Sequence, residues 1–296
     1  MSALPTESVL VHHAGSRDLT ARLVLGEPGV PMLIEPGERL GFSVDPVRWC
    51  LGHRDLSGLP VPCPKAARIE TGRMCRECAA HDPWRWMHVA HRVQSLNPGL
   101  AEKLRHPHWL YVATFAGGSH KVGTAHDERK RVRLDEQGPL FAHWVALAED
   151  GLVVRELEDL VSQQLGLGQV VRSSAKATGL SGAVDLDRLR TDHDQLVADV
   201  RDILALAPDV APLAEPWPNP RDLSSLTGLT LRAYPGSLDA GSHGFTVQQC
   251  WGPVALVGLD DDPDSTYAVD LSRLIGHRLS FGDHATESPQ WQDSLF

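Results

Sequence analysis

Four cysteines grouped between positions 50 and 78 constrain this chain more than any other feature. Cys50, Cys63, Cys75 and Cys78 are separated by twelve, eleven and two residues. The two-residue spacing lets both sulfurs reach one ion at about 2.3 Å, and four thiolates complete the closed tetrahedral shell typical of structural zinc. The first residues show no basic segment followed by an apolar one, so we expect no signal peptide and a cytoplasmic location. There, clustered cysteines favour a metal over disulfides. The sequence therefore predicts a structural zinc site.

Two other interpretations of the cluster stay open. His53 forms a Cys50-x-x-His53 pair that would leave Cys63 outside the metal shell. The cysteines could also be unrelated to one another or include a redox pair. The second interpretation is disfavoured because residues 50–95 contain few large aliphatic side chains and need a bound metal or another cross-link to fold. We therefore expect chelation of the metal to unfold them. Cys250 stands alone and is expected to be an ordinary buried thiol.

The composition is that of a soluble globular protein. Of 296 residues, 42% are hydrophobic and 22% are charged, which excludes disordered and collagenous classes. No apolar run approaches the ~18 residues that a membrane span needs, so we expect no membrane partner.

The residue pattern predicts an α+β protein with five consecutive parts. These are a β-rich N-terminal unit (1–49), a treble-clef-like zinc knuckle (50–105), an α/β core (106–205), a proline-rich linker (206–221) and a β-rich C-terminal region (222–296). Residues 37–42 and 276–281 have weakly similar sequences, and this similarity is too short to establish a repeat.

Within the core, composition and periodicity predict a three-stranded antiparallel sheet with helices. The first two strands are separated by a Gly117-Gly118-Ser119 turn, which is typical of a hairpin. The expected strands are 109–115, 120–124 and 140–147, and the expected helices are 127–135, 153–165 and 189–204.

This order of elements resembles the GIY-YIG nuclease fold. Leu110-Tyr111-Val112 and Lys121-Val122-Gly123 stand in place of the two paired tripeptides, followed by a helix with arginines, a strand, and a helix with Glu158. With the four cysteines included, roughly positions 20–170 are similar to a bacterial and archaeal family of unknown function. That family joins a four-cysteine zinc knuckle to a GIY-YIG-like core.

The resemblance implies roles for individual residues. Glu158 would hold one Mg²⁺ ion, and Tyr111 would orient or deprotonate the attacking water. An arginine would contact the scissile phosphate; Arg131 matches the nuclease motif and Arg133 matches the zinc-containing family, and both stay open. His126 is a candidate auxiliary acid or base. Further phosphate contacts are expected from Lys121, Arg129 and Lys130.

Two departures from the nuclease pattern weaken the case for catalysis. Lys121 stands where the nucleases carry a tyrosine, and Trp109-Leu110 replaces Gly-Ile. A lysine with its ordinary pKa of about 10.4 binds phosphate but is a poor acid–base group. Each candidate also has a structural interpretation: Tyr111 as a strand aromatic, the basic run as a solvated helix face, and Glu158 as a charge favoured near a helix N-terminus.

The predicted function is that of a zinc-containing protein acting on DNA or RNA, with a Mg²⁺-dependent endonuclease that hydrolyses phosphodiester bonds as the sharpest form. The alternatives are a non-catalytic nucleic-acid-binding module and a zinc-stapled structural protein with a protein partner. Steep salt dependence of nucleic-acid binding would separate the first two from the third.

The net charge of −10 argues against a nucleic-acid partner until it is divided along the chain. Residues 50–133 hold fourteen Lys and Arg against seven Asp and Glu, or +7. The rest of the chain holds 14 basic and 31 acidic residues, or −17. The segment with both motifs is therefore basic, which allows a surface that faces phosphates.

Overall fold

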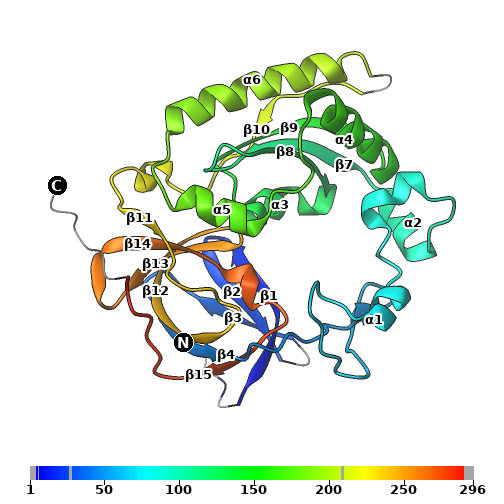
Figure 1. The fold of residues 1–296 in the computed structure, drawn as a ribbon. Helices are drawn as coiled ribbons and strands as arrows, with labels where there is room; N and C mark the ends of the chain where they lie inside the picture. The colour runs from blue at the N-terminus through cyan, green and yellow to red at the C-terminus, as the bar shows by residue number, and fades with distance from the viewer. Residues whose placement is uncertain (1–4, 6, 27–28, 208–209, 290–296) are drawn as a thin grey trace.

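The computed structural model describes residues 5, 7–26, 29–207 and 210–289 and confirms a mixed α+β protein (Figure 1). A nine-stranded sheet lies at the lower left of Figure 1, and a four-stranded sheet with its helices lies at the top. The cysteine-rich module, residues 50–105, lies at the right of Figure 1, beside the two sheets.

Strands from both ends of the chain form the nine-stranded sheet, in the order β11-β14-β13-β12-β4-β15-β1-β2-β3. β4 (Arg39–Val44) lies between β12 (Gly241–Trp251) and β15 (Arg278–Phe281) and is antiparallel to both. Residues from both ends also share one hydrophobic core. The segments expected as separate units at 1–49 and 222–296 therefore fold together. The other strands are β1 (Val9–Arg17), β2 (Thr20–Leu25), β3 (Val30–Ile34), β11 (Leu231–Ala233), β13 (Val254–Leu259) and β14 (Asp262–Asp270).

The two segments with weakly similar sequences, 37–42 and 276–281, lie next to each other in the sheet. β4 and β15 pair directly, with Phe42 opposite Phe281. The 3-10 helices η3 (Leu223–Leu226) and η4 (Leu271–Leu274) connect the C-terminal strands.

The four-stranded sheet has the order β10-β9-β7-β8, with all neighbours antiparallel. β7 and β8 form the expected hairpin, in which Tyr111 pairs with Gly123. The three expected strands are present, and a short fourth strand extends the sheet at one edge. The strands are β7 (His108–Thr114), β8 (His120–His126), β9 (Phe141–Ala148) and β10 (Glu215–Pro216).

The segment expected as a proline-rich linker packs against this sheet instead of standing away from it. The Leu213 amide donates to the Val145 carbonyl at 2.8 Å, and the Trp217 amide donates to the Ala142 carbonyl at 2.9 Å. Proline lacks an N–H and is tolerated at a sheet edge, so Pro216 fits its place in β10. Pro208, also part of the expected linker, lies outside the described residues.

Helices α4 (Gly151–Leu165) and α6 (Leu186–Leu204) share one hydrophobic core with β7 and β8. Asp150 caps the start of α4, because its carboxylate accepts the Leu152 and Val153 amides at 2.8 Å, and Gly166 with φ +64° caps its end. The helices expected at 153–165 and 189–204 are thus present. The remaining helices of this region are η2 (Asp127–Arg129), α3 (Lys130–Gln137) and α5 (Ser173–Leu180).

A buried ion pair joins the two sheets. Helices α3 and α5 lie between them (Figure 1), and Asp135 of α3 pairs with Arg221 at 2.5 Å. Both side chains are less than 8% exposed. The second carboxylate oxygen of Asp135 accepts the Asp18 amide at 2.7 Å. One carboxylate therefore ties the first hairpin of the large sheet to the core.

The cysteine-rich module consists of a two-stranded hairpin and short helices. Asn97 caps α2 by accepting the Leu100 amide at 2.9 Å. No helix in the described part of the chain is long and apolar enough to span a membrane. The elements of the module are β5 (His53–Arg54), β6 (Pro60–Val61), α1 (Arg76–His81), η1 (Met87–Arg92) and α2 (Pro98–Leu104).

Candidate functional site

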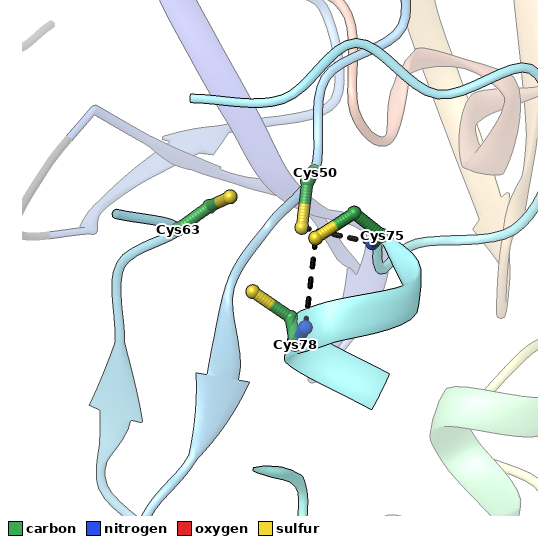
Figure 2. Close-up of side chains that lie close together, drawn as sticks. All are labelled: Cys50, Cys63, Cys75 and Cys78. Carbon is green, nitrogen blue, oxygen red and sulfur yellow. Dashed lines mark hydrogen bonds between the residues drawn. The ribbon is translucent and has the colours of Figure 1, made fainter. Parts of the chain in front are cut away.

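The four clustered cysteines converge on one point. Their sulfur atoms all lie within 4.8 Å of one another, and none is in a disulfide. Figure 2 shows Cys50 and Cys63 on either side of the β5–β6 hairpin, with Cys75 and Cys78 at the start of α1. His53 is not part of this group, although it forms the competing pair in the sequence. The set that can hold a metal is therefore the four thiols.

Backbone amides already point at these sulfurs. The Cys50 sulfur accepts the Gly52 amide at 3.4 Å and the Cys75 amide at 3.1 Å. The Cys75 sulfur accepts the Cys78 amide at 3.5 Å, and this bond holds the pKa of Cys75 at about 7. Burial raises the pKa of Cys50 and of Cys78. A bound cation would deprotonate such thiols outright, so the donor set fits a tetrahedral thiolate-bound ion.

Cys250 lies apart from this group, as expected. It is 2% exposed, and burial raises the pKa of its thiol to about 12. A buried thiol with a raised pKa is unreactive.

A second feature is a cavity of about 780 Å³ where the two sheets and the cysteine-rich module meet. Its wall is strongly basic. Eight of the lining residues are cationic and two are acidic: Arg22, Arg54, Arg73, Lys121, Arg129, Arg133, Arg155 and Lys176, with Glu136 and Glu158.

Four of the residues singled out in the sequence line this cavity: Lys121, Arg129, Arg133 and Glu158. Glu158 of α4 is 4% exposed and pairs with Arg155 at 2.6 Å. Arg129 pairs with Glu136. The Arg133 guanidinium has no hydrogen bond or ion pair within the described residues, and its Nε atom is buried without a partner. The two carboxylates of the cavity wall, Glu136 and Glu158, therefore each form an ion pair with an arginine. Other cations of the wall have no carboxylate partner in the described part of the chain.

Tyr111 lies beneath the cavity wall and does not line it. Its ring is fully buried, and its hydroxyl has no hydrogen-bond partner in the described part of the chain. A Cβ added to Gly123, which does line the cavity, would lie 2.6 Å from the Tyr111 hydroxyl. A side chain at this position would therefore collide with the tyrosine, and Gly123 and Lys121, which do line the cavity, lie against the Tyr111 ring.

The structure places the other three candidates elsewhere. Lys130 pairs with Glu215 at 2.7 Å and lies over the Trp109 ring, and it shares a separate cavity with Arg131. His126 accepts the Glu128 amide at 3.2 Å and packs against two other histidine rings. Of the two arginines left open by the sequence, Arg133 is the one that lies in the same cavity as Glu158.

Lys176 is a cavity residue that the sequence analysis missed. It is 5% exposed, and its ammonium donates to the Gln137 carbonyl at 2.7 Å. Burial, together with the nearby charges of Lys121 and Arg133, lowers the pKa of Lys176 to about 7. Helix α5 contains mainly small residues and no charged motif, so nothing in its sequence marks this lysine.

This pKa predicts a specific pH dependence of stability. Between pH 7 and about 10.5 the unfolded chain keeps the Lys176 proton that the folded chain has lost, so stability rises with pH. Compared with Lys176→Met, the wild-type protein should gain about 2 kcal/mol of unfolding free energy between pH 7 and pH 9. Urea unfolding at each pH measures this.

A matched control is Lys103→Met, because Lys103 is an exposed lysine outside the cavity. Its pH profile should run parallel to that of the wild type. Parallel profiles for wild type and Lys176→Met would show that the Lys176 pKa is not lowered.

The module is fastened to the core beside the cavity. Asp159 of α4 accepts hydrogen bonds from His91 at 2.8 Å and from Arg92, both of the module. It also accepts from Gln169, a cavity residue, at 2.8 Å. Burial alone would raise the pKa of Asp159, but the bonds from Arg92, Gln169 and His91 outweigh it and lower the pKa to about 2. This carboxylate therefore stays ionised and fixes one wall of the cavity.

No protein-family model, curated protein sequence or solved structure matches this chain. The similarity to the zinc-knuckle family with a GIY-YIG-like core therefore stays a prediction.

Proposed function

We propose that this protein acts on nucleic acid and holds backbone phosphates in the basic cavity. The observation that carries this proposal is the unmatched positive charge: eight cationic residues line the cavity, and its two carboxylates are already paired with arginines. Clefts with low-dielectric walls and one sign of charge concentrate ions of the opposite sign.

Phosphate suits these particular side chains. Arginine guanidinium binds phosphate through two parallel hydrogen bonds, and Arg133 has no partner within the described residues that would compete. Buried charges without partners lower stability, so an anion that compensates them binds favourably.

In our proposal the four cysteines hold a structural zinc ion that contributes to this function indirectly, by ordering part of the cavity wall. Arg54, Arg73 and His88 of the cysteine-rich module line the cavity. A zinc ion held by the four cysteines would fix these side chains in place, and no reaction step would occur at the ion.

Binding of this kind should weaken steeply with salt. If the cavity neutralises about four phosphates of a single strand, affinity should fall roughly 50-fold between 50 and 200 mM salt. Fluorescence anisotropy with labelled single-stranded DNA and RNA measures this. Absence of binding to both, or binding that salt does not change, would favour the structural or protein-interaction alternative.

Hydrolysis of the bound strand is the second candidate, and the shared cavity of Glu158 and Arg133 favours it. Mg²⁺ binds through one or two carboxylates with water and substrate oxygens, which fits a single cavity carboxylate once Arg155 releases it. The ion would neutralise charge on the phosphate. Arg133 would orient the phosphate, and Tyr111 would act on the water only if its hydroxyl reaches past Gly123.

The hydrolysis proposal predicts cleavage that depends on Mg²⁺ and on these side chains. Glu158→Gln and Tyr111→Phe should each lower the cleavage rate by roughly 10²–10⁴-fold, whereas Glu156→Gln, on the exposed side of α4, should not. Gel assays on branched, damaged and single-stranded substrates measure this, with thermal melts to verify folding. If the protein binds these substrates and cuts none, it is a non-catalytic binding module.

A further inference from the structure

Three cations from different elements meet in the cavity without an acidic partner. Lys121 comes from β8, Arg133 from α3 and Lys176 from α5. All three line the cavity, and Lys121 and Arg133 lie close enough to Lys176 to disfavour its charge. This group is called the cation triad below.

Lys121 and Lys176 of the triad are buried without a carboxylate partner, whereas Arg22, Arg54 and Arg73, which also lack one within the described residues, are more exposed. Lys121 is 4% exposed; its ammonium has no hydrogen bond or ion pair within the described residues and lies 5.4 Å from the Tyr111 ring centre. Arg133 has a buried, unpartnered Nε atom. Lys176 donates only to the backbone and side-chain oxygens of Gln137. By contrast, Arg155 and Arg129 have carboxylate partners.

We infer that the cation triad is a subsite for a phosphate monoester at the end of a nucleic-acid strand. This inference rests on the proposed function and names the part of the strand that the cavity prefers. A monoester carries a charge of about −1.5 to −2 at pH 7 and has three strong acceptor oxygens, whereas an internal phosphodiester carries about −1. The monoester therefore compensates the positive charge of Lys121, Arg133 and protonated Lys176 more completely.

The rest of the cavity wall offers little to a base. The only aromatic rings among the described lining residues are those of His13 and His88. Proteins that hold strands through their bases use stacked aromatic side chains. Selection in this cavity therefore depends on phosphate charge and on the position of the phosphate in the strand.

Oligonucleotides that differ only at their ends test this inference. The same single-stranded sequence is prepared with a 5′-phosphate, with a 3′-phosphate, and with hydroxyls at both ends. A strand that is two nucleotides longer and has hydroxyl ends carries two more phosphodiesters, and so matches the charge of a strand with one fully ionised terminal monoester. We expect one of the two phosphorylated strands to bind roughly tenfold more tightly than the charge-matched strand. Which of the two binds more tightly shows whether the subsite holds a 5′-phosphate or a 3′-phosphate.

Variants then show which residues cause the preference for a terminal phosphate. Lys176→Met and Lys121→Gln should each reduce the tenfold ratio to near one, while Lys103→Met, outside the cavity, should keep it. Thermal melts verify that each variant is folded, and the wild-type ratio decides the question even if a variant is not. Equal, salt-dependent binding of all four oligonucleotides would overturn the terminal-phosphate subsite and leave the proposed function standing. Binding of none of them would overturn the proposed function itself.

Discussion

Treatment with a chelator is expected to unfold the cysteine-rich module while the two large sheets remain folded. The module has only a small apolar cluster, whose fully buried members are Ala90, Leu100 and Leu104. Structural zinc contributes roughly 10–16 kcal/mol of folding free energy in zinc-finger peptides, far more than so small a cluster supplies. Hydrogen exchange of the full chain should show residues 50–95 losing protection on chelation.

Variants at two buried cysteines distinguish metal loss from simple loss of a thiol. Cys78 and Cys250 are both 2% exposed, but only Cys78 belongs to the four-sulfur group. Cys78→Ser should abolish stoichiometric zinc in elemental analysis and reproduce the effect of chelation. Cys250→Ser should retain the zinc. Zinc-free protein from careful purification, or unchanged exchange after chelation, would contradict a structural zinc site.

Breaking the buried pair between Asp135 and Arg221 should have the second largest effect. Asp135→Ala leaves the Arg221 guanidinium buried without a counter-charge and also removes the acceptor of the Asp18 amide. Loss of one partner of a buried pair costs about 3–5 kcal/mol. Urea unfolding, followed by circular dichroism, should show this decrease in unfolding free energy.

The surface pair between Arg39 and Asp260 provides the matched comparison. Its side chains are 37% and 47% exposed, so Arg39→Ala should cost no more than about 1 kcal/mol. A double variant, Asp135→Leu with Arg221→Met, should recover most of the stability lost in Asp135→Ala. If Asp135→Ala cost no more than Arg39→Ala, the pair would not be a main tie between the two sheets.

Local patterns in the sequence were sufficient for several elements of the fold. The apolar stripe of α4 and the turn between β7 and β8 lie where they were expected. The pairing of β4 with β12 and β15 could not be foreseen, because strand composition does not identify a partner some 200 residues away. The proline-rich segment was misread for a related reason: its prolines fit an edge strand as well as a linker.

The candidate site was predictable where its residues belong to a motif or a charged run. Five of the eight cavity cations come from the basic stretch 50–133, but Arg22, Arg155 and Lys176 come from elsewhere in the chain. Arg155 lies on α4, while the place of Arg22 and Lys176 in the cavity depends on the packing of the large sheet and α5 against the core. Arg131 and Lys130 show the converse, because residues two or three positions from Arg133 on one short helix point to a different cavity.

The central claim is that nucleic acid binds in the basic cavity, and a charge-matched pair of variants tests it most directly. Lys121→Gln with Arg133→Gln removes two charges inside the cavity, and Lys130→Gln with Arg131→Gln removes two charges outside it. Anisotropy titrations over a range of salt should show weaker binding, and a salt slope lower by about 1 to 2, for the first variant only. Equal effects of the two variants, or a larger effect of the second, would contradict binding in the cavity.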